Sequence, residues 1–331
     1  MTNSSGAYRT VAVSFEPLPE VESLFDMAFD TTYYREDRVL SGDEFVDFAR
    51  GHDALIVTPK QRLDRALLHQ LSDHLDTIGT YSVGTDHIDL VAARDLGFRV
   101  LNTSDVLTDA VAEVAMFLIL GAARRATESI ELIRAGRWRG WTPTQLPGRQ
   151  LTGKRLGIFG MGRIGQAVAE RARAFGLKVH YCNRRRLPPE SEGLATFHAS
   201  LEDLLPSSDI LLIACPATQE TAGLINATAI ARLPVGAMVV NVARGNIVDD
   251  EALIQGLQSG KLWAAGLDVF MGEPQLDPRY FQLPNLLMTP HIGSSTLEAR
   301  EQMALALVEG LRQLERGHTP ENLLCGSVRV S

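Results

Sequence analysis

Residues 156–165 read LGIFGMGRIG, an apolar run followed by three glycines in the pattern GxGxxG. The apolar run predicts a strand over 156–159, and the pattern after the last glycine predicts a helix over 166–175. A glycine turn between a strand and a helix places a pyrophosphate at the N-terminus of that helix. With a second strand expected over 178–182, the stretch predicts a dinucleotide-binding α/β domain that begins near the middle of the chain.

The residues about twenty positions after the glycine turn select the dinucleotide. A carboxylate there binds the ribose 2′-hydroxyl of NAD, whereas positive charge accommodates the 2′-phosphate of NADP. This chain has no carboxylate there but reads Asn183, Arg184, Arg185 and Arg186. Three guanidinium groups can give a phosphate charge-assisted hydrogen bonds, so we expect NADP, with NADPH preferred over NADH. The alternative interpretation is a solvated basic loop.

Composition limits the partners and the compartment. The chain has 331 residues, enough for about two domains, and a formal net charge of −8, which argues against nucleic acid or an anionic membrane as the main partner. Three scattered cysteines predict neither a disulfide framework nor a metal site. The longest uncharged apolar stretch, 114–123, is too short to span a membrane, and no secretory signal is visible at the N-terminus. We therefore expect a cytoplasmic protein.

Before the glycine turn, apolar runs alternate with helical patterns, which predicts a parallel sheet covered by helices. We expect strands over 8–15, 54–57, 76–79 and 99–102 and helices over 43–49, 63–71 and 87–96, the last with Asp86 as its N-cap. An apolar helix over 108–125 and an irregular loop over 136–150 follow.

After the glycine turn the alternation continues and then stops. We expect strands over 209–214, 238–241, 264–268 and 286–288 and helices over 200–205, 250–259 and 296–316. The early sheet and a terminal helix with no sheet after it suggest that the nucleotide-binding domain is inserted in a discontinuous first domain.

Charged side chains follow several strands of the second sheet. Arg244, Asp268, Glu273 and His291 lie at or after strand ends, where ligands of open parallel sheets bind. Arg244 can hold a carboxylate and polarise a carbonyl, and His291 can donate a proton to the carbonyl oxygen as hydride reaches the carbon. Glu273 can pair with His291 and favour its charged form. Spacing alone leaves open a surface ion pair for Arg244 and a solvated turn for Glu273.

At these residues the chain resembles the D-isomer-specific 2-hydroxyacid dehydrogenase family over nearly its whole length. The matching motifs are SVGTDHID at 82–89, VLTDAVAE at 106–113, GMGRIG at 160–165, CPATQET at 215–221, NVARGNIVDD at 241–250, GLDVFMGEP at 266–274 and PHIGSST at 290–296. Within the family the nearest likeness is to glyoxylate/hydroxypyruvate reductases. The resemblance implies two Rossmann-like or flavodoxin-like parallel-sheet domains, with an NADP-binding domain over 105–295 inserted in a substrate-binding domain over 1–104 and 296–331.

The resemblance also implies roles for individual residues. It places the catalytic arginine, glutamate and histidine at Arg244, Glu273 and His291, and a nicotinamide-carboxamide partner at Asp268. The cofactor contacts that it implies are Gly160, Gly162, Arg163, Ile164, Gly165, Asn183, Arg184, Arg185, Cys215, Pro216, Thr221, Val242, Ala243, Arg244, Asp268, His291 and Gly293. The substrate contacts are Ser82, Val83, Gly84, Arg244, His291 and Trp141.

The resemblance further implies a homodimer built on the long helix, in which Trp138 and Trp141 belong to a loop that reaches the partner. An ordinary interface or core position is the alternative for Trp141. The expected reaction is reduction of a small 2-oxo acid, such as glyoxylate or hydroxypyruvate, to the D-2-hydroxy acid. A D-lactate, phosphoglycerate or phosphite dehydrogenase of the same fold and a non-catalytic, cofactor-sensing corepressor are alternatives.

Overall fold

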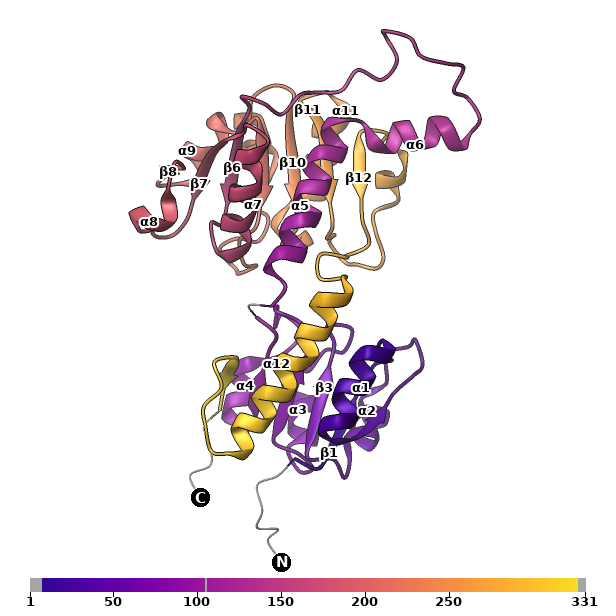
Figure 1. Ribbon diagram of the computed structural model, residues 1–331, viewed down its shortest axis with the longest axis vertical. Helices are drawn as coiled ribbons and strands as arrows, with labels where there is room; N and C mark the ends of the chain where they lie inside the picture. The colour runs from indigo at the N-terminus through magenta and orange to yellow at the C-terminus, as the bar shows by residue number, and fades with distance from the viewer. Residues whose placement is uncertain (1–7, 105, 327–331) are drawn as a thin grey trace, which may run out of the picture. The chain divides into compact units, whose positions relative to one another are not determined.

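The computed structural model describes residues 8–104 and 106–326, which form two compact α/β units (Figure 1). One unit comprises residues 1–107 with 295–331, and the other comprises residues 108–294. Each unit is built on its own sheet. The expected fold class, α/β with two parallel-sheet domains, is therefore confirmed.

The first unit contains a six-stranded sheet among its described residues, with the strand order β13-β5-β4-β3-β1-β2. Every neighbouring pair is parallel except β13 with β5. The strands are β1 (Thr10–Val13), β2 (Asp30–Tyr33), β3 (Ala54–Val57), β4 (Thr77–Thr80), β5 (Arg99–Leu101) and β13 (Leu323–Cys325). The helices are α1 (Pro19–Ala28), α2 (Gly42–Ala49), α3 (Arg65–Leu71), α4 (Leu90–Asp95) and α12 (Leu297–Glu315).

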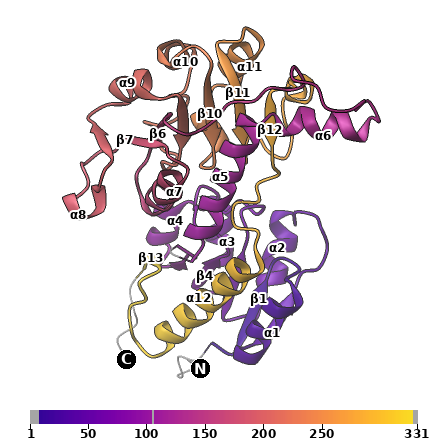
Figure 2. The ribbon, with the colours of Figure 1, turned by 45° about the horizontal axis from the view of Figure 1, so that its top comes forward.

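Alternation along each strand divides the core of this unit between the two faces of the sheet. Leu55, Val57 and Ile78 pack with the buried residues of α2, α3 and α4. On the opposite face a leucine of α12 lies against Gly79, and α1 packs beside α12, as Figure 2 shows. The C-terminal helix therefore completes a sheet whose strands come mostly from the first hundred residues.

Two expectations for the first unit are wrong, and two elements were not predicted. Asp89, not Asp86, is the N-cap of α4, because its side chain accepts a hydrogen bond from the Ala92 amide. The terminal helix is followed by strand β13, which extends the sheet antiparallel to β5. Helix α1 and the edge strand β2 were not predicted.

The second unit contains a seven-stranded, fully parallel sheet with the strand order β12-β11-β10-β9-β6-β7-β8. The strands are β6 (Arg155–Phe159), β7 (Lys178–Cys182), β8 (Thr196–His198), β9 (Ile210–Ile213), β10 (Ala237–Asn241), β11 (Leu262–Leu267) and β12 (Leu286–Met288). The helices are α5 (Thr108–Ala123), α6 (Ala126–Arg134), α7 (Arg163–Ala174), α8 (Pro189–Glu192), α9 (Leu201–Leu204), α10 (Ala227–Arg232) and α11 (Asp250–Gln258). Strand β8 and helices α8 and α10 were not predicted.

Helices cover both faces of this second sheet. Helices α5 and α7 lie on the near face in Figure 1, while α9, α10 and α11 contribute to the core on the other face. Helix α5 sits close to the strands because Gly266 and Gly121 lack side chains: a Cβ on Gly266 would lie 2.9 Å from Leu118, and one on Gly121 would lie 2.4 Å from Leu287. Helix α5 is therefore buried against the sheet of its own unit.

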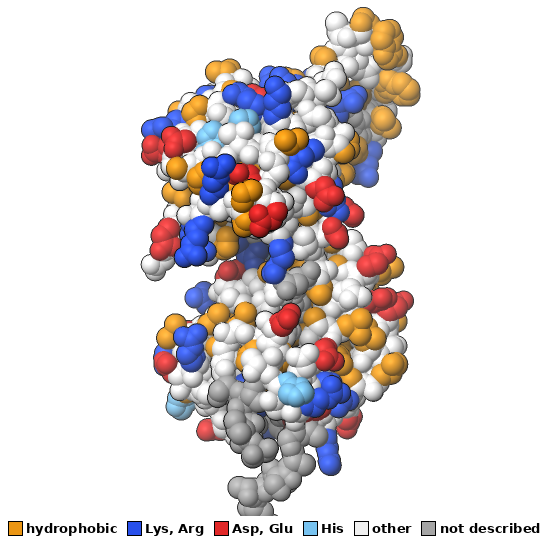
Figure 3. Space-filling model, turned by 60° about the vertical axis from the view of Figure 1, so that its left-hand side comes forward, with side chains coloured by type: hydrophobic (Ala, Val, Ile, Leu, Met, Phe, Trp, Pro, Cys, Tyr) orange, Lys and Arg blue, Asp and Glu red, His pale blue; other side chains and the backbone are white. Residues whose placement is uncertain are grey.

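Beyond α5, helix α6 and the irregular segment 135–150 form an arm with little buried surface. The arm exposes Ile130, Ile133, Trp138 and Trp141, and Trp141 has 83% of its surface exposed. Figure 3 shows hydrophobic side chains gathered at the projecting tip of this unit. Within the described ranges, no helix is long and apolar enough to cross a membrane.

Candidate functional site

The residues expected to bind the cofactor follow the carboxyl ends of β6, β7, β9, β10, β11 and β12 in the second unit. Because the sheet is parallel throughout, all of these ends lie along one edge. Strand β6 is paired with β7 on one side and β9 on the other, so the direction in which the chain adds strands reverses at β6. In open α/β sheets this reversal point is where ligands bind.

The glycine turn has the dimensions of a pyrophosphate cradle. Gly160 has φ of 103°, and a Cβ on it would lie 2.5 Å from the Cys215 amide nitrogen. A Cβ on Gly165 would lie 2.4 Å from the Gly160 carbonyl oxygen. Gly162, the N-cap of α7, has no atom within 4 Å of where its Cβ would be. Two glycines thus permit close packing, and the open space at the third gives a phosphate access to the helix N-terminus.

The segment after β7 differs from expectation at one arginine. Arg184 and Arg185 are exposed, but Arg186 forms an ion pair with Glu192 at 2.8 Å. The side chain of Asn183 holds the glycine turn, because Oδ1 accepts from the Met161 amide at 2.7 Å. The three guanidinium groups therefore differ in their surroundings: Arg186 already has a carboxylate partner, whereas Arg184 and Arg185 are the exposed candidates for a 2′-phosphate.

The loop after β9 is a closed turn beside the glycine turn. Thr221 Oγ1 accepts from the Thr218 amide at 2.7 Å and donates to the Pro216 carbonyl at 2.9 Å. Cys215 is buried, and burial raises the pKa of its thiol to about 12. At neutral pH this thiol is therefore protonated, which fits an apolar wall rather than a nucleophile or metal ligand. The described residues contain no cluster of three potential metal ligands.

Asp268 shapes the turn that carries His291. Its carboxylate is 1% exposed and accepts hydrogen bonds from Thr289 Oγ1 at 2.6 Å and from the amides of Ile292 and Gly293 at 2.8 Å each. His291 lies between these anchors with φ of 54°, a left-handed conformation that non-glycine residues rarely adopt. These hydrogen bonds define the backbone of the turn and so place the Cα of His291 just beyond β12.

Glu273 and His291 form the hydrogen-bonded pair expected from the sequence. Glu273 Oε1 lies 2.7 Å from His291 Nδ1, with the side chains 34% and 45% exposed. Burial opposes ionisation of Glu273, but the hydrogen bond with His291, the hydrogen bond from the Phe270 amide and the nearby positive charges together outweigh it, so the pKa of Glu273 lies below its ordinary value. The carboxylate therefore orients the ring through Nδ1 and leaves Nε2 as the position for proton transfer.

The Arg244 loop lies against the segment that carries Glu273. A Cβ on Gly245 would lie 1.9 Å from the Phe270 carbonyl carbon, so the two backbones touch here and only glycine fits. The positive charge of Arg244 also contributes to lowering the pKa of Glu273. The buried Asn241 fixes this loop by accepting from the Ala243 amide at 3.0 Å and donating to the Arg244 carbonyl at 2.9 Å. Arg244, Glu273 and His291 thus belong to one neighbourhood.

The expected carboxylate-binding turn, Ser82–Gly84, lies in the first unit and is held by hydrogen bonds within that unit. All three carbonyls accept hydrogen bonds: Ser82 from the Thr103 amide at 3.1 Å, Val83 from Asn102 at 3.2 Å and Gly84 from the Ser82 hydroxyl at 2.7 Å. None of the described residues accepts a hydrogen bond from the amides of Val83 or Gly84. The turn therefore offers donors, as an anion site requires.

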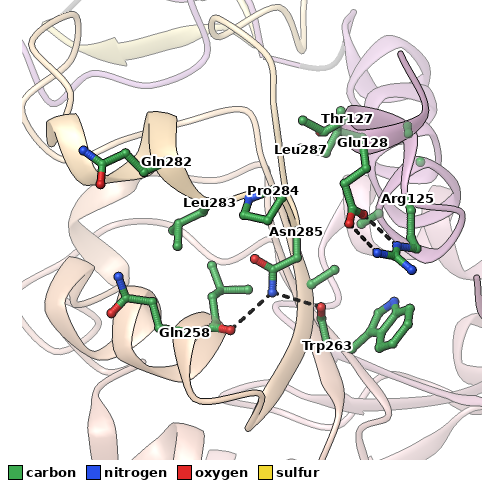
Figure 4. A pocket seen from close by; sticks show the side chains of 15 residues that line it. Arg125, Thr127, Glu128, Gln258, Trp263, Gln282, Leu283, Pro284, Asn285 and Leu287 are labelled. Atoms are coloured by element: carbon green, nitrogen blue, oxygen red, sulfur yellow. Dashed lines mark hydrogen bonds and ion pairs between the residues drawn. The ribbon is translucent and has the colours of Figure 1, made fainter. Parts of the chain in front are cut away.

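A cavity of about 450 Å³ in the second unit is separate from these residues. It lies between α5, α6, β11 and β12, and its wall includes the Arg125–Glu128 ion pair, Trp263 and Asn285 (Figure 4). Asn285 donates hydrogen bonds to the carbonyls of Leu257 and Trp263. No residue of the predicted site lines this cavity.

Comparisons with known proteins agree with this arrangement. Residues 116–293 match the family described as D-isomer specific 2-hydroxyacid dehydrogenase, NAD binding domain. A glycerate dehydrogenase of Hyphomicrobium methylovorum is 41% identical, covering 87% of this chain and 90% of the relative. The chain belongs to the D-isomer-specific 2-hydroxyacid dehydrogenase family. It is thus an oxidoreductase with a domain for a nicotinamide cofactor.

Two solved structures of this dehydrogenase family are similar to the chain. A putative D-isomer specific 2-hydroxyacid dehydrogenase from Polaromonas sp. JS6 66 is 46% identical with a TM-score of 0.92, covering 96% of this chain and all of the other. An NADPH-dependent glyoxylate/hydroxypyruvate reductase from Sinorhizobium meliloti, solved with NADP and malonate, is 30% identical with a TM-score of 0.86. That match covers 98% of this chain and all of the other.

Sequence reasoning missed several residues that support the dehydrogenase site. Asn241 and Thr289 hold the Arg244 and His291 loops, and Glu192 anchors Arg186. A polar residue such as Asn241 at the end of an apolar strand is a usable signal, because a buried amide needs hydrogen-bond partners. Thr289 and Glu192 carry no such signal, since their partners become clear only in three dimensions.

Proposed function

We propose that this dehydrogenase reduces small 2-oxo acids, such as glyoxylate and hydroxypyruvate, to D-2-hydroxy acids with NADPH. The observation that carries the proposal is the Glu273–His291 pair at 2.7 Å beside the Arg244 loop, on the sheet edge that also bears the glycine turn. A proton donor and a cation for the substrate carboxylate are the groups that such a reduction requires.

The chain's residues divide the work of the reaction. Arg244 binds the substrate carboxylate and polarises the carbonyl, and Glu273 holds the imidazole of His291 through Nδ1. His291 donates its proton to the carbonyl oxygen, which becomes the hydroxyl of the product. NADPH, when bound, supplies the hydride that the carbonyl carbon receives. Asp268 retains acceptor capacity beyond its three hydrogen bonds and can accept one from the nicotinamide carboxamide.

We assign the two units to cofactor and substrate. Residues 105–295 would bind NADP through the sheet edge described above. Residues 1–104 with 296–331 would bind the substrate through the amides of Val83 and Gly84. Both amides lie in a turn whose carbonyls are already occupied, which supports an anion as the ligand. A Gly84→Pro variant, which lacks that N–H, is expected to weaken substrate binding and leave NADPH binding intact.

The function is tested by following NADPH oxidation by absorbance with a panel of 2-oxo acids. We expect turnover with glyoxylate and hydroxypyruvate and formation of the D-isomer from hydroxypyruvate. The 41% identity to a glycerate dehydrogenase favours a second candidate, the oxidation of D-glycerate, which is the reverse of hydroxypyruvate reduction. The ratio of the two rates at neutral pH decides the working direction. Absence of turnover with every acid in both directions would refute the proposal.

Arg184 and Arg185 are expected to determine the cofactor preference. Two guanidinium groups against one 2′-phosphate are worth roughly 1.4–4 kcal/mol, about ten- to several-hundredfold in kcat/KM for NADPH over NADH. The double variant Arg184→Gln/Arg185→Gln should lose most of this preference through a higher KM for NADPH, with kcat/KM for NADH little changed. Equal efficiency of the unmodified enzyme with both cofactors would contradict the assignment.

Replacing Glu273 with Gln is expected to lower kcat of reduction about tenfold or more, because the carboxylate that orients the imidazole through Nδ1 is lost. Glutamine keeps the length of the side chain but places no negative charge beside His291. The measurement is kcat with saturating NADPH and 2-oxo acid at neutral pH, where the lowered pKa of Glu273 keeps this carboxylate charged in the unmodified enzyme. Glu202→Gln, an exposed control, should leave kcat unchanged. An unchanged kcat in Glu273→Gln would show that the pair does not position the proton donor.

We also propose that the protein is a homodimer through its nucleotide-binding unit. The support is the arm with exposed Ile130, Ile133, Trp138 and Trp141, because apolar side chains gathered in one place on a surface mark an interaction site. Trp141, the most exposed of these, is the residue that would reach the partner's substrate site. Sedimentation velocity should give twice the mass of one chain, and a monomer at micromolar concentration would refute the dimer.

A cytoplasmic location is proposed on the state of the cysteines. Cys182, Cys215 and Cys325 are all unpaired and buried, as is usual in a reducing compartment. Cell fractionation with a tagged chain tests this location, and recovery outside the cytoplasm would contradict it.

A further inference from the structure

The segment between β7 and α8 is held at both of its ends. At the first end, Asn183 Oδ1 accepts from the Met161 amide at 2.7 Å, and Asn183 Nδ2 donates to the Met161 carbonyl at 3.3 Å. At the other end, the Leu187 amide donates to the Tyr181 hydroxyl at 3.0 Å. Arg184 and Arg185 lie between these anchors and are exposed. The two arginines therefore project from a short tip whose base cannot move freely.

Glu192 is the centre of the second anchor. The residue is 6% exposed, although it is a carboxylate in a one-turn helix near the surface. Its carboxylate accepts from the Tyr181 hydroxyl at 2.6 Å, from Arg186 Nε at 3.0 Å and from Arg186 Nη2 at 2.8 Å. The hydrogen bond from Arg186, with that from Tyr181, holds the pKa of Glu192 below its ordinary value. At neutral pH this carboxylate is therefore charged, and both of its oxygens accept hydrogen bonds from Tyr181 or Arg186.

The same contacts hold the side chain of Arg186 in place. Its Nε and one Nη are bonded to Glu192, and its guanidinium carbon lies 5.9 Å from the centre of the Phe197 ring on β8. Moving Arg186 to a phosphate would leave the buried charge of Glu192 without its partner. The free-energy cost of that unpaired charge opposes the exchange. Its position six residues before Glu192 joins the tip to helix α8.

We propose that Tyr181, Arg186 and Glu192 form a clamp that positions Arg184 and Arg185 for the 2′-phosphate of NADP. Arg186 is then a positioning residue rather than a phosphate ligand. The clamp increases specificity because long side chains lose less freedom on binding when the backbone beneath them is already ordered. The inference rests on the proposed preference for NADP, and it names the residues that determine how strongly NADPH is preferred over NADH.

The decisive variant is Glu192→Gln, which keeps the shape of the side chain. The amide oxygen can still accept from Tyr181, but the amide nitrogen faces Arg186 and cannot accept from it, so the ion pair is lost. We expect binding of 2′,5′-ADP, measured by calorimetry, to weaken about three- to tenfold, with 5′-AMP binding unchanged within twofold. KM for NADPH should rise by the same factor while kcat at saturation stays constant.

A double-mutant cycle separates the clamp from direct contact. If Arg186 acts through Glu192, then Arg186→Gln should have the same effect as Glu192→Gln, and the double variant should be no worse than either. Arg186 is 65% exposed, so its variant tests the clamp even if Glu192→Gln folds poorly. Asp209→Asn is the matched control, because it breaks a similar ion pair with Arg155. That pair lies at the amino ends of β6 and β9, whereas Glu192 and Arg186 lie beyond the carboxyl end of β7.

Each remaining outcome of this experiment overturns the clamp. Tighter 2′,5′-ADP binding in Glu192→Gln would mean that Arg186, once released, is itself a phosphate ligand. Equal weakening of 2′,5′-ADP and 5′-AMP binding would mean that Glu192 has only a general structural role. Unchanged binding of both nucleotides would mean that Glu192 has no role in nucleotide binding. If the unmodified enzyme binds both nucleotides equally, the proposed NADP preference fails as well, which distinguishes that failure from failure of the clamp alone.

Discussion

Replacing His291 should lower the turnover of 2-oxo acid reduction by about 10²–10⁴, the range expected when a positioned proton donor is removed. His291→Asn is the sharper of the two useful variants. The residue has φ of 54°, and asparagine adopts this left-handed conformation more readily than alanine does. The asparagine variant therefore keeps the turn while removing the group that carries the proton. His291→Ala should lose at least as much activity.

The measurement is kcat with saturating NADPH and 2-oxo acid, with cofactor affinity determined separately. We expect NADPH binding to stay within a few fold, since the glycine turn and the Arg184–Arg185 tip are untouched. His69→Ala, which removes an exposed histidine from the first unit, should behave as the unmodified enzyme. Turnover of His291→Asn close to that of the unmodified enzyme would exclude His291 as the proton donor.

Several elements could be predicted because their signals are local. Strands β3, β7 and β12 have the bounds that their apolar runs predicted, whereas α7 begins at Arg163, inside the GxGxxG motif and before the predicted start at 166. The grouping of Arg244, Glu273 and His291 could also be predicted, because parallel strands bring their carboxyl ends to one edge whatever the loops do. The contact between Glu273 and His291 at 2.7 Å is a consequence of that rule.

What could not be predicted depends on partners distant in sequence or on choices between equivalent residues. Asp268 was expected to face the cofactor, but its first role is to bind the amides of a turn more than twenty residues later. Arg186 has the same chemistry as its two neighbours and differs only because Glu192 and Tyr181 lie beside it. Strand β13 is three residues long and pairs with β5 more than two hundred residues earlier, so periodicity gives no sign of it.

Replacing Arg244 with Gln should lower kcat/KM for glyoxylate by about 10²–10³, equivalent to about 2.7–4 kcal/mol of transition-state stabilisation. One N–H of its guanidinium donates to the Ala243 carbonyl at 2.7 Å, which orients the side chain, and the planar group can bind a carboxylate through two parallel hydrogen bonds. Glutamine is too short and uncharged, so it supplies neither the charge nor the paired geometry. Arg244→Lys keeps the charge but has no fork, and we expect it to lie between the two.

The loss must come from the substrate carboxylate rather than from the fold. The loop around Arg244 is held by Asn241 and by the contact of Gly245 with Phe270, neither of which uses the guanidinium. Arg244→Gln should therefore unfold at a temperature close to that of the unmodified enzyme while binding oxalate, a dicarboxylate mimic of glyoxylate, at least tenfold more weakly in the presence of NADPH. Arg232→Gln, which removes an exposed arginine paired with Glu202, is the control and should change neither property.

Unchanged oxalate binding in Arg244→Gln would mean that the substrate carboxylate is held elsewhere. The amides of Val83 and Gly84 would then be the remaining candidates, because their turn has already used its carbonyls.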